Sequence, residues 1–188
     1  MKNIFKNKKI IVVGSTGFKG SWLCLWLSQK GAKVVGIGLQ PEKGSIIFKS
    51  LKLEKDIKQY YLDITNFSKF NYIVKKEKPN LIFHLAAQSV VSYSYTKPLL
   101  TFNTNIIGSA NILEACRINK VKNLIYITSD KCYLNKEYVR GYKESDELGG
   151  YDNYSSSKAS AEIIFKSYYN SYFKKINFYL PLQQEQEM

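Results

Sequence analysis

The sequence predicts an α/β fold built on one parallel sheet. Short apolar runs rich in Val and Ile alternate along the chain with longer segments of helical periodicity, which is typical of successive βαβ units. The first run, 10–13, leads into glycines at 14, 17 and 20, and a helical segment and a second apolar run follow within about 30 residues. A glycine-rich turn at this place favours a ligand site at the carboxyl edge of the sheet.

The glycine turn predicts a dinucleotide-binding loop. Gly14 permits a tight turn out of the strand, Gly17 allows backbone N–H groups close to a pyrophosphate, and Gly20 lets the next helix pack on the sheet. Thr16 and Phe18 belong to the same predicted loop. Unpaired N–H groups and the helix dipole favour negative charge here. The alternative interpretation is a glycine turn without a ligand.

Further apolar runs predict strands at 33–37, 57–62, 81–85 and 124–128. Apolar residues at helical spacing predict helices at 21–30, 66–78, 98–119 and 153–173, with a shorter helix around 48–53. Asn66 and Pro98 are the expected start signals of two of these helices. Because no repeat, linker or low-complexity tract interrupts this order, we expect one Rossmann-like, doubly wound parallel sheet.

The composition excludes several classes of protein. The 188 residues include 28 basic and 15 acidic side chains, a formal net charge of +13. Arg occurs only at 117 and 140 and the lysines are scattered, so we do not expect specific nucleic-acid binding. No apolar run approaches the ~20 residues that span a bilayer, which indicates a cytoplasmic protein without membrane contact. Three cysteines without Cys-x-x-Cys spacing predict neither disulfides nor a metal site.

Two polar clusters are candidates for chemistry. Tyr154 and Lys158 are four residues apart in the last predicted helix, so they share one face, where an ammonium lowers the pKa of a phenol. Ser129, Asp130 and Lys131 directly follow the last predicted strand and reach the edge of the sheet where the glycine turn lies. Each cluster alone has an ordinary interpretation, as a surface pair or as turn residues. Their order behind a glycine turn favours an active site.

The motifs together resemble a known enzyme family. Gly14-x-x-Gly17-x-x-Gly20, His84-Leu-Ala-Ala-Gln88, Asn105-x-x-Gly108 and Tyr154-x-x-x-Lys158 resemble the extended short-chain dehydrogenase/reductases. More narrowly, segments 14–23, 128–133 and 148–158 resemble CDP-glucose 4,6-dehydratases. The resemblance implies NAD as cofactor and CDP-glucose as substrate, for the synthesis of lipopolysaccharide and other surface-polysaccharide sugars. It also implies a homodimer formed through the helices at 98–119 and 153–173.

Transferred by position, the resemblance assigns a role to each polar residue. Tyr154 would be the base that takes the proton of the C4 hydroxyl. Lys158 would assist it and hold the nicotinamide ribose, and Ser129 would bind the C4 oxygen. Asp130 would protonate the departing C6 hydroxyl, and Lys131 would be the base for the C5 proton.

The remaining cofactor contacts are implied by the same resemblance and by the small residues after the strand at 81–85. They are Asp63, Ile64, Leu85, Ala86 and Ala87, the first two beside the adenine. No acidic residue ends the second strand to hold the adenosine ribose, so the preference for NAD over NADP rests on the resemblance. His84 fits two interpretations, a buried structural histidine or a ligand contact.

The last residues depart from the resemblance. We interpret 1–179 as an NAD-binding domain lacking the C-terminal strands and substrate-binding lobe of the family, and 180–188 as a tail from a frameshifted gene. We therefore expect the chain to be inactive and poorly stable on its own. Two other functions stay open: another nucleotide-sugar reductase such as an epimerase, and a nucleotide-binding protein without enzymatic activity.

Overall fold

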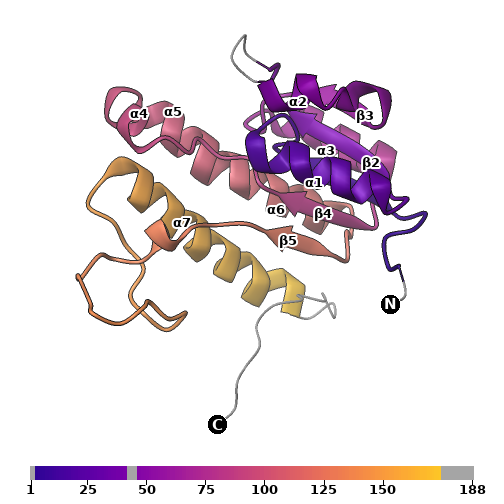
Figure 1. The fold of residues 1–188 in the computed structure, drawn as a ribbon. Coiled ribbons are helices and arrows are strands. Elements are labelled where there is room, and N and C mark those ends of the chain that lie inside the picture. Colours follow the sequence, from indigo (N-terminus) through magenta and orange to yellow (C-terminus); the bar gives the residue numbers. More distant parts are fainter. Residues whose placement is uncertain (1–2, 42–45, 175–188) are drawn as a thin grey trace.

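A parallel sheet between two layers of helices forms the centre of the molecule (Figure 1). The computed structural model describes residues 3–41 and 46–174. The strands are β1 Lys9–Val13, β2 Lys33–Gly38, β3 Lys58–Tyr61, β4 Leu81–His84 and β5 Leu124–Tyr126. They are parallel and lie in the order β3-β2-β1-β4-β5, so β1 is the switch point from which the sheet extends both ways. The predicted Rossmann-like fold class is confirmed.

Helices connect the strands: α1 Phe18–Gln29, α2 Ile46–Ser50, α3 Phe67–Glu77, α4 Val91–Thr96, α5 Pro98–Phe102, α6 Ser109–Ile118 and α7 Asn153–Tyr168. Shorter turns of 3₁₀ geometry are η1 Leu53–Lys55 and η3 Asp130–Cys132, and turns of π geometry are η2 Asn103–Gly108 and η4 Tyr169–Phe173. Asn66 caps α3 as predicted, because its side chain accepts a hydrogen bond from the Lys69 N–H at 3.1 Å.

The two faces of the sheet bury separate apolar clusters. In β1, Ile11 and Val13 pack in the cluster formed with α3, α6 and α7, whereas Ile10 and Val12 pack in the cluster formed with α1 and α2. All four side chains are fully buried. A strand covered on both faces has no polar alternation, which is why the run at 10–13 is continuously apolar.

A buried carboxylate ties the amino ends of two strands to α3. Glu77 is 5 % exposed and accepts hydrogen bonds from Lys9 at 3.1 Å, Lys58 at 2.6 Å and Tyr60 at 2.7 Å. Burial alone would raise the pKa of Glu77, but the hydrogen bonds from Lys58, Tyr60 and Lys9 outweigh it and lower the pKa to about 2. Glu77 therefore remains a carboxylate throughout the neutral range.

The predicted helix at 98–119 is confirmed, but it is not α-helical throughout. It begins at Pro98 as expected and runs to Ile118, with the π turn η2 between α5 and α6, whereas the preceding α4 was not predicted. Asn105 in η2 donates a hydrogen bond to Ser157 Oγ at 2.9 Å. A Cβ at Gly108 would lie 2.6 Å from Ile64 Cδ1. These tertiary contacts accompany the change of helical geometry and leave no trace in apolar spacing.

Some large apolar residues of the helices are exposed. α1 begins at Phe18 rather than at 21, and its Trp22 and Trp26 are each more than two-fifths exposed. Leu99, on α5, is also exposed. The interpretations of residues 175–188, including the boundary at 179 and the tail, lie outside the described residues.

Candidate active site

A cavity of about 490 Å³ opens at the carboxyl edge of the sheet. Every residue predicted to bind the cofactor lines it: Gly14, Thr16, Gly17, Phe18, Gly20, Asp63, Ile64, Leu85, Ala86, Ala87, Tyr154 and Lys158. Ser129 lines it as well. Open parallel sheets bind ligands at this edge. The fold thus brings residues that are distant in the sequence, around 14, 63, 86, 129 and 154, to one place.

The glycine turn is fixed by close backbone contacts. Gly14 has a φ of +92°, and a Cβ there would lie 2.8 Å from the Ala86 nitrogen. A Cβ at Gly20 would lie 2.0 Å from the Gly14 carbonyl oxygen. Gly17 differs, because its φ is −78° and a Cβ would be 3.4 Å from the nearest atom. The fold therefore requires glycine at 14 and 20 and does not itself require it at 17.

The first turn of α1 fits an anionic ligand. Gly17 is its N-cap residue, no side chain caps the turn, and the turn contains no acidic residue. Backbone N–H groups at a helix start have no partner within the helix and bind phosphate well. The chain therefore presents a cradle of backbone donors to the cavity, of the kind that a pyrophosphate fits.

The end of β2 offers no carboxylate to a ribose diol. Gly38 and Leu39 line the cavity there, and a Cβ at Gly38 would lie 2.6 Å from Thr16 Oγ1, so the glycine turn packs directly on β2. Asp63, after β3, is the acidic residue among the lining residues that the structure describes. Its Oδ1 accepts hydrogen bonds from the Thr65 N–H at 2.9 Å and the Thr65 hydroxyl at 2.8 Å.

Tyr154 and Lys158 reach the cavity from the start of α7 and are both buried. Asp152 caps this helix by accepting a hydrogen bond from the Ser155 N–H at 2.9 Å, which fixes the end of α7 that carries Tyr154. Burial lowers the pKa of the Lys158 ammonium, and Glu162 opposes that change. A phenol and a buried ammonium therefore share the cavity with the glycine turn.

Ser129, Asp130 and Lys131 divide between two cavities. Ser129 lines the first, whereas Asp130 and Lys131 line a second cavity of about 370 Å³. Ser129 Oγ donates to Asp130 Oδ1 at 3.1 Å and accepts from the Lys131 N–H at 3.3 Å. The turn η3 thus links the two cavities. Asp130 and Lys131 are exposed, unlike Tyr154.

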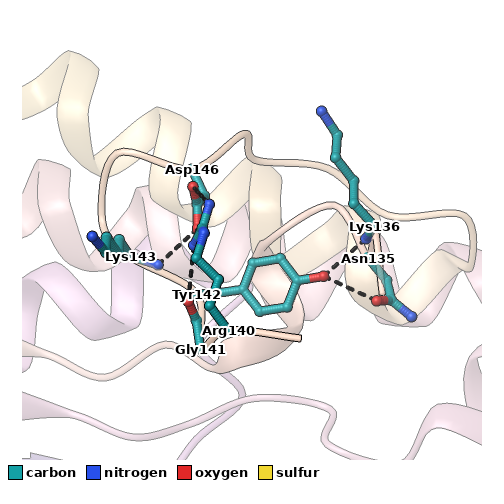
Figure 2. Close-up of polar contacts among 7 residues, drawn as sticks. All are labelled: Asn135, Lys136, Arg140, Gly141, Tyr142, Lys143 and Asp146. Atoms are coloured by element: carbon teal, nitrogen blue, oxygen red, sulfur yellow. Dashed lines mark hydrogen bonds and ion pairs between the residues drawn. The ribbon is translucent and has the colours of Figure 1, made fainter. Parts of the chain in front are cut away.

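The second cavity is bordered by the loop that connects η3 to α7 and stands away from the sheet (Figure 1). Tyr133 and Tyr142 both line the cavity, and their rings stack with centroids 5.6 Å apart. The Tyr142 hydroxyl accepts from the Lys136 N–H at 2.8 Å and donates to Asn135 Oδ1 at 3.0 Å (Figure 2). These contacts give one wall of the second cavity an aromatic surface.

An ion pair closes the same loop. Arg140 donates to both oxygens of Asp146 at 2.7 Å, and Asp146 also accepts from the Lys143 N–H at 2.8 Å (Figure 2). These hydrogen bonds lower the pKa of Asp146 to about 2. Arg140 is therefore held by the loop and lines neither cavity.

Asn105 has a structural role that the sequence pattern did not reveal, although the residue lies in one of the motifs named above. Its side chain is 1 % exposed, accepts from the Gln88 N–H at 2.8 Å and donates to Ser157 on α7. It therefore connects the cavity wall after β4 to the helix that carries Tyr154. Other lining residues not anticipated are Lys19, Gly38, Leu39, Leu62, Ser89, Thr104, Ile127 and Thr128. Several of them directly follow strands, and this position in the sequence is the signal that could have predicted them.

His84 is a buried structural residue. It is 2 % exposed, its Nε2 lies 3.0 Å from Ser109 Oγ, and its Nδ1 has no hydrogen-bond partner in the described part of the chain. Burial, together with the charge of Lys158, lowers the pKa of His84 to about 3, so the imidazole is neutral. It lines neither cavity.

The cysteines Cys24, Cys116 and Cys132 are buried free thiols. Within residues 3–41 and 46–174, no three His, Cys, Asp or Glu side chains gather as a metal site requires. In the same ranges, no helix has both the length and the apolar character needed to cross a bilayer.

Known proteins resemble this chain along most of its length. The family profile described as GDP-mannose 4,6 dehydratase matches residues 11–179. The CDP-glucose 4,6-dehydratase of Salmonella typhimurium is 40 % identical over 178 residues, which cover 94 % of this chain and 50 % of that protein. The chain spans about half the length of the curated relatives it matches.

Solved structures share the fold. The UDP-glucose 4-epimerase of Thermotoga maritima, solved with UDP-glucose, has a TM-score of 0.76 at 27 % identity and covers 87 % of this chain and 52 % of its own. The UDP-glucose 4-epimerase of Thermus thermophilus, solved as a complex with NAD, has a TM-score of 0.73 at 25 % identity, covering 87 % of this chain and 51 % of its own.

Proposed function

Since the chain belongs to the GDP-mannose 4,6 dehydratase family of sugar-nucleotide dehydratases and epimerases, we propose that it carries the NAD site and catalytic residues of a CDP-glucose 4,6-dehydratase, a lyase. The product would be CDP-4-keto-6-deoxyglucose, a precursor of lipopolysaccharide sugars. The observation that carries the proposal is one cavity lined by the glycine turn, Ser129, Tyr154 and Lys158, with Asp130 and Lys131 at the next.

The cofactor assignment is supported by the shape and charge of the first cavity. The backbone cradle at Gly17 would hold the pyrophosphate, Asp63 and Ile64 would lie beside the adenine, and Lys158 would hold the nicotinamide ribose. When bound, NAD would supply the acceptor of a hydride from the sugar and its later donor. The residues of the chain then need only orient the sugar and move protons.

Proton transfer would divide between the two cavities. Tyr154 would take the proton of the C4 hydroxyl while Ser129 holds its oxygen, and the ammonium of Lys158 would stabilise the phenolate. Elimination of water at the neighbouring carbons needs a base for the C5 proton and an acid for the departing C6 hydroxyl. Lys131 would be the base and Asp130 the acid. The C6 hydroxyl would leave as water with the proton from Asp130.

Epimerisation at C4 is the second candidate, favoured by the likeness to UDP-glucose 4-epimerases. An epimerase removes and returns hydride at one carbon only. It would therefore use Tyr154 and Lys158 and leave Asp130 and Lys131 without a chemical role.

The deciding experiment measures NAD binding by calorimetry and turnover of CDP-glucose and UDP-glucose. Because the chain spans half of its relatives, it is assayed alone and joined to the second half of the Salmonella relative. We expect NAD binding in both forms and the 4-keto-6-deoxy product from CDP-glucose in the joined form. A C4 epimer as product would support the second candidate. NAD binding without any turnover in either form would indicate a nucleotide-binding protein without enzymatic activity.

Lys131→Ala in the joined form separates oxidation at C4 from the elimination of water. Oxidation at C4 does not need Lys131, so NADH absorbance should accumulate in a single turnover without release of product. Lys122→Ala, at the opposite end of the sheet, is the matched control and should turn over normally. Normal product formation by Lys131→Ala would remove this residue from the mechanism.

We further propose that the protein is cytoplasmic and that the joined form is a homodimer built through segments 98–119 and 153–173. Exposed apolar side chains on both segments support this, among them Leu99, Ile107 and Ile163. Analytical ultracentrifugation should find a dimer that Ile163→Glu converts to a monomer. A wild-type monomer at high concentration would contradict the assignment.

A further inference from the structure

Glu162 lies on the same face of α7 as two residues of the proposed site. Tyr154, Lys158 and Glu162 follow one another at intervals of four residues, so their side chains stack along one side of the helix. Tyr154 and Lys158 line the first cavity, and Glu162 comes one turn beyond them. It is the acidic residue of α7.

Thr128 holds the Glu162 carboxylate in place. Its Oγ1 donates a hydrogen bond to Glu162 Oε1 at 2.5 Å. Thr128 lies after β5, directly before Ser129, and lines the same cavity as Lys158. The carboxylate is therefore bound to the wall of the cavity as well as to the helix, which fixes its position relative to Lys158.

Lys158 has little else to support its charge. It is 7 % exposed and forms no ion pair with any residue that the structure describes. The groups that face it from other elements are neutral: His84 of β4, and the thiol of Cys132 in η3, whose pKa burial raises to about 11. The phenol of Tyr126, on β5, is also neutral, because burial raises its pKa.

Other carboxylates are already engaged: Asp63, which lines the same cavity as Lys158, accepts two hydrogen bonds from Thr65. Glu114, on α6, accepts two hydrogen bonds from Arg117 and one from Tyr168. Burial lowers the pKa of Lys158, and Glu162 makes the largest contribution in the opposite direction. Glu162 is thus the carboxylate available to compensate the ammonium.

We propose that Glu162 is a positioning residue that keeps the Lys158 ammonium charged at the wall of the cavity. The inference rests on the proposed function, in which Lys158 holds the ribose and supports Tyr154. Glu162 acts through Lys158 and touches neither cofactor nor sugar. Its carboxylate favours the charged ammonium, which burial disfavours.

The test measures the titration of Lys158 in the 188-residue chain. Lysines are dimethylated with a ¹³C label, and the Lys158 signal is identified by its absence in Lys158→Arg. Glu162→Gln keeps the size of the side chain and an acceptor for Thr128 but removes the charge. The Lys158 signal should then titrate at lower pH, and Glu162→Asp should restore part of the difference. Glu114→Gln, the matched control, should leave the titration unchanged.

NAD affinity at two pH values gives a second readout. Glu162→Gln should weaken NAD binding about tenfold at pH 9 but less than about twofold at pH 6, where Lys158 is protonated in both proteins. An unchanged Lys158 titration, or an equal loss of affinity at both pH values, would overturn the proposal. If the unmodified chain binds no NAD, the proposed cofactor site fails, while the titration of Lys158 still decides the role of Glu162.

Discussion

The two ends of the parallel sheet are held in different ways. At the amino end, the charge of Glu77 is compensated within the chain by Lys9 and Lys58. At the carboxyl end, Gly14 and Gly20 are held by backbone contacts, and the donors of α1 meet no acidic side chain in the first turn. The uncompensated positive charge therefore lies at the carboxyl end, where it is available to a ligand. Substitutions at the amino end should change stability, and those at the carboxyl end should mainly change binding.

Gly20→Val should have the largest effect on stability and is the exception to this division. A Cβ at this position overlaps the Gly14 carbonyl oxygen, so the turn must move away from β1. We expect a loss of about 3 kcal/mol or more in the free energy of unfolding, measured by urea titration. A Gly20→Val protein as stable as the unmodified chain would show that the turn adapts easily.

Glu77→Gln should have the next largest effect on stability. Removing the charge of a carboxylate that is bound by two ammonium groups should lower the free energy of unfolding by about 2 kcal/mol at pH 7. Because the folded pKa of Glu77 is about 2 and lies below its ordinary value, this stabilisation is complete above pH ~4.3 and is lost as the pH falls towards 2. The measurement is thermal unfolding of both proteins from pH 2 to 7.

The control for that series is Glu144→Gln, which alters an exposed carboxylate. Its melting temperature should equal that of the unmodified protein at every pH. A stability difference between Glu77→Gln and the unmodified chain that persists undiminished at pH 2 would contradict the assigned role of the Glu77 charge.

Gly17→Val should impair ligand binding at the carboxyl end with little effect on folding. A side chain fits at this position without strain, so the free energy of unfolding should change by less than about 1 kcal/mol. NAD binding, measured by calorimetry, should be abolished, because the branched side chain enters the space where a pyrophosphate meets the backbone. Unchanged NAD affinity in this folded variant would show that the glycine turn is only a turn.

Arg140→Met should have the smallest effect on stability. The pair joins the exposed Arg140 to the partly buried Asp146 and lies in the loop between η3 and α7, outside both ends of the sheet. The melting temperature should fall by less than about 2 °C, whereas cleavage by chymotrypsin at Tyr138 and Tyr142 should accelerate several-fold. Arg117→Met, which breaks a pair within α6, should not change that cleavage rate. Equal rates in all three proteins would mean that the pair does not hold the loop.

Prediction from the sequence succeeds where the signal is local. The first strand, the glycine turn and the second strand are encoded by consecutive residues, and the carboxyl edge of a parallel sheet necessarily gathers the residues at the end of each strand. That rule predicts that Ala86 and Ser129 reach the same edge of the sheet, and both line the first cavity, whereas Asp63 was expected there from the family resemblance.

The failures are non-local. The π turn η2 accompanies a hydrogen bond between Asn105 and Ser157, 52 positions apart. Glu77 belongs to a run of charged residues that is typical of a solvated helix end, and its burial depends on strands elsewhere in the chain. The division of Ser129 from Asp130 between two cavities depends on the fold of the loop between η3 and α7.

His84 has a consequence for spectroscopy. It is the only histidine of the chain, and it lies buried close enough to Lys158 to feel its charge. Its pKa of about 3 means that the imidazole does not titrate above pH ~5, so its ¹⁵N chemical shifts report only on its surroundings. A single resonance pair, free of overlap from the lysines, would therefore record the ionisation of Lys158 and the arrival of a nucleotide. A residue without a chemical role gives the molecule a built-in NMR probe of its own site.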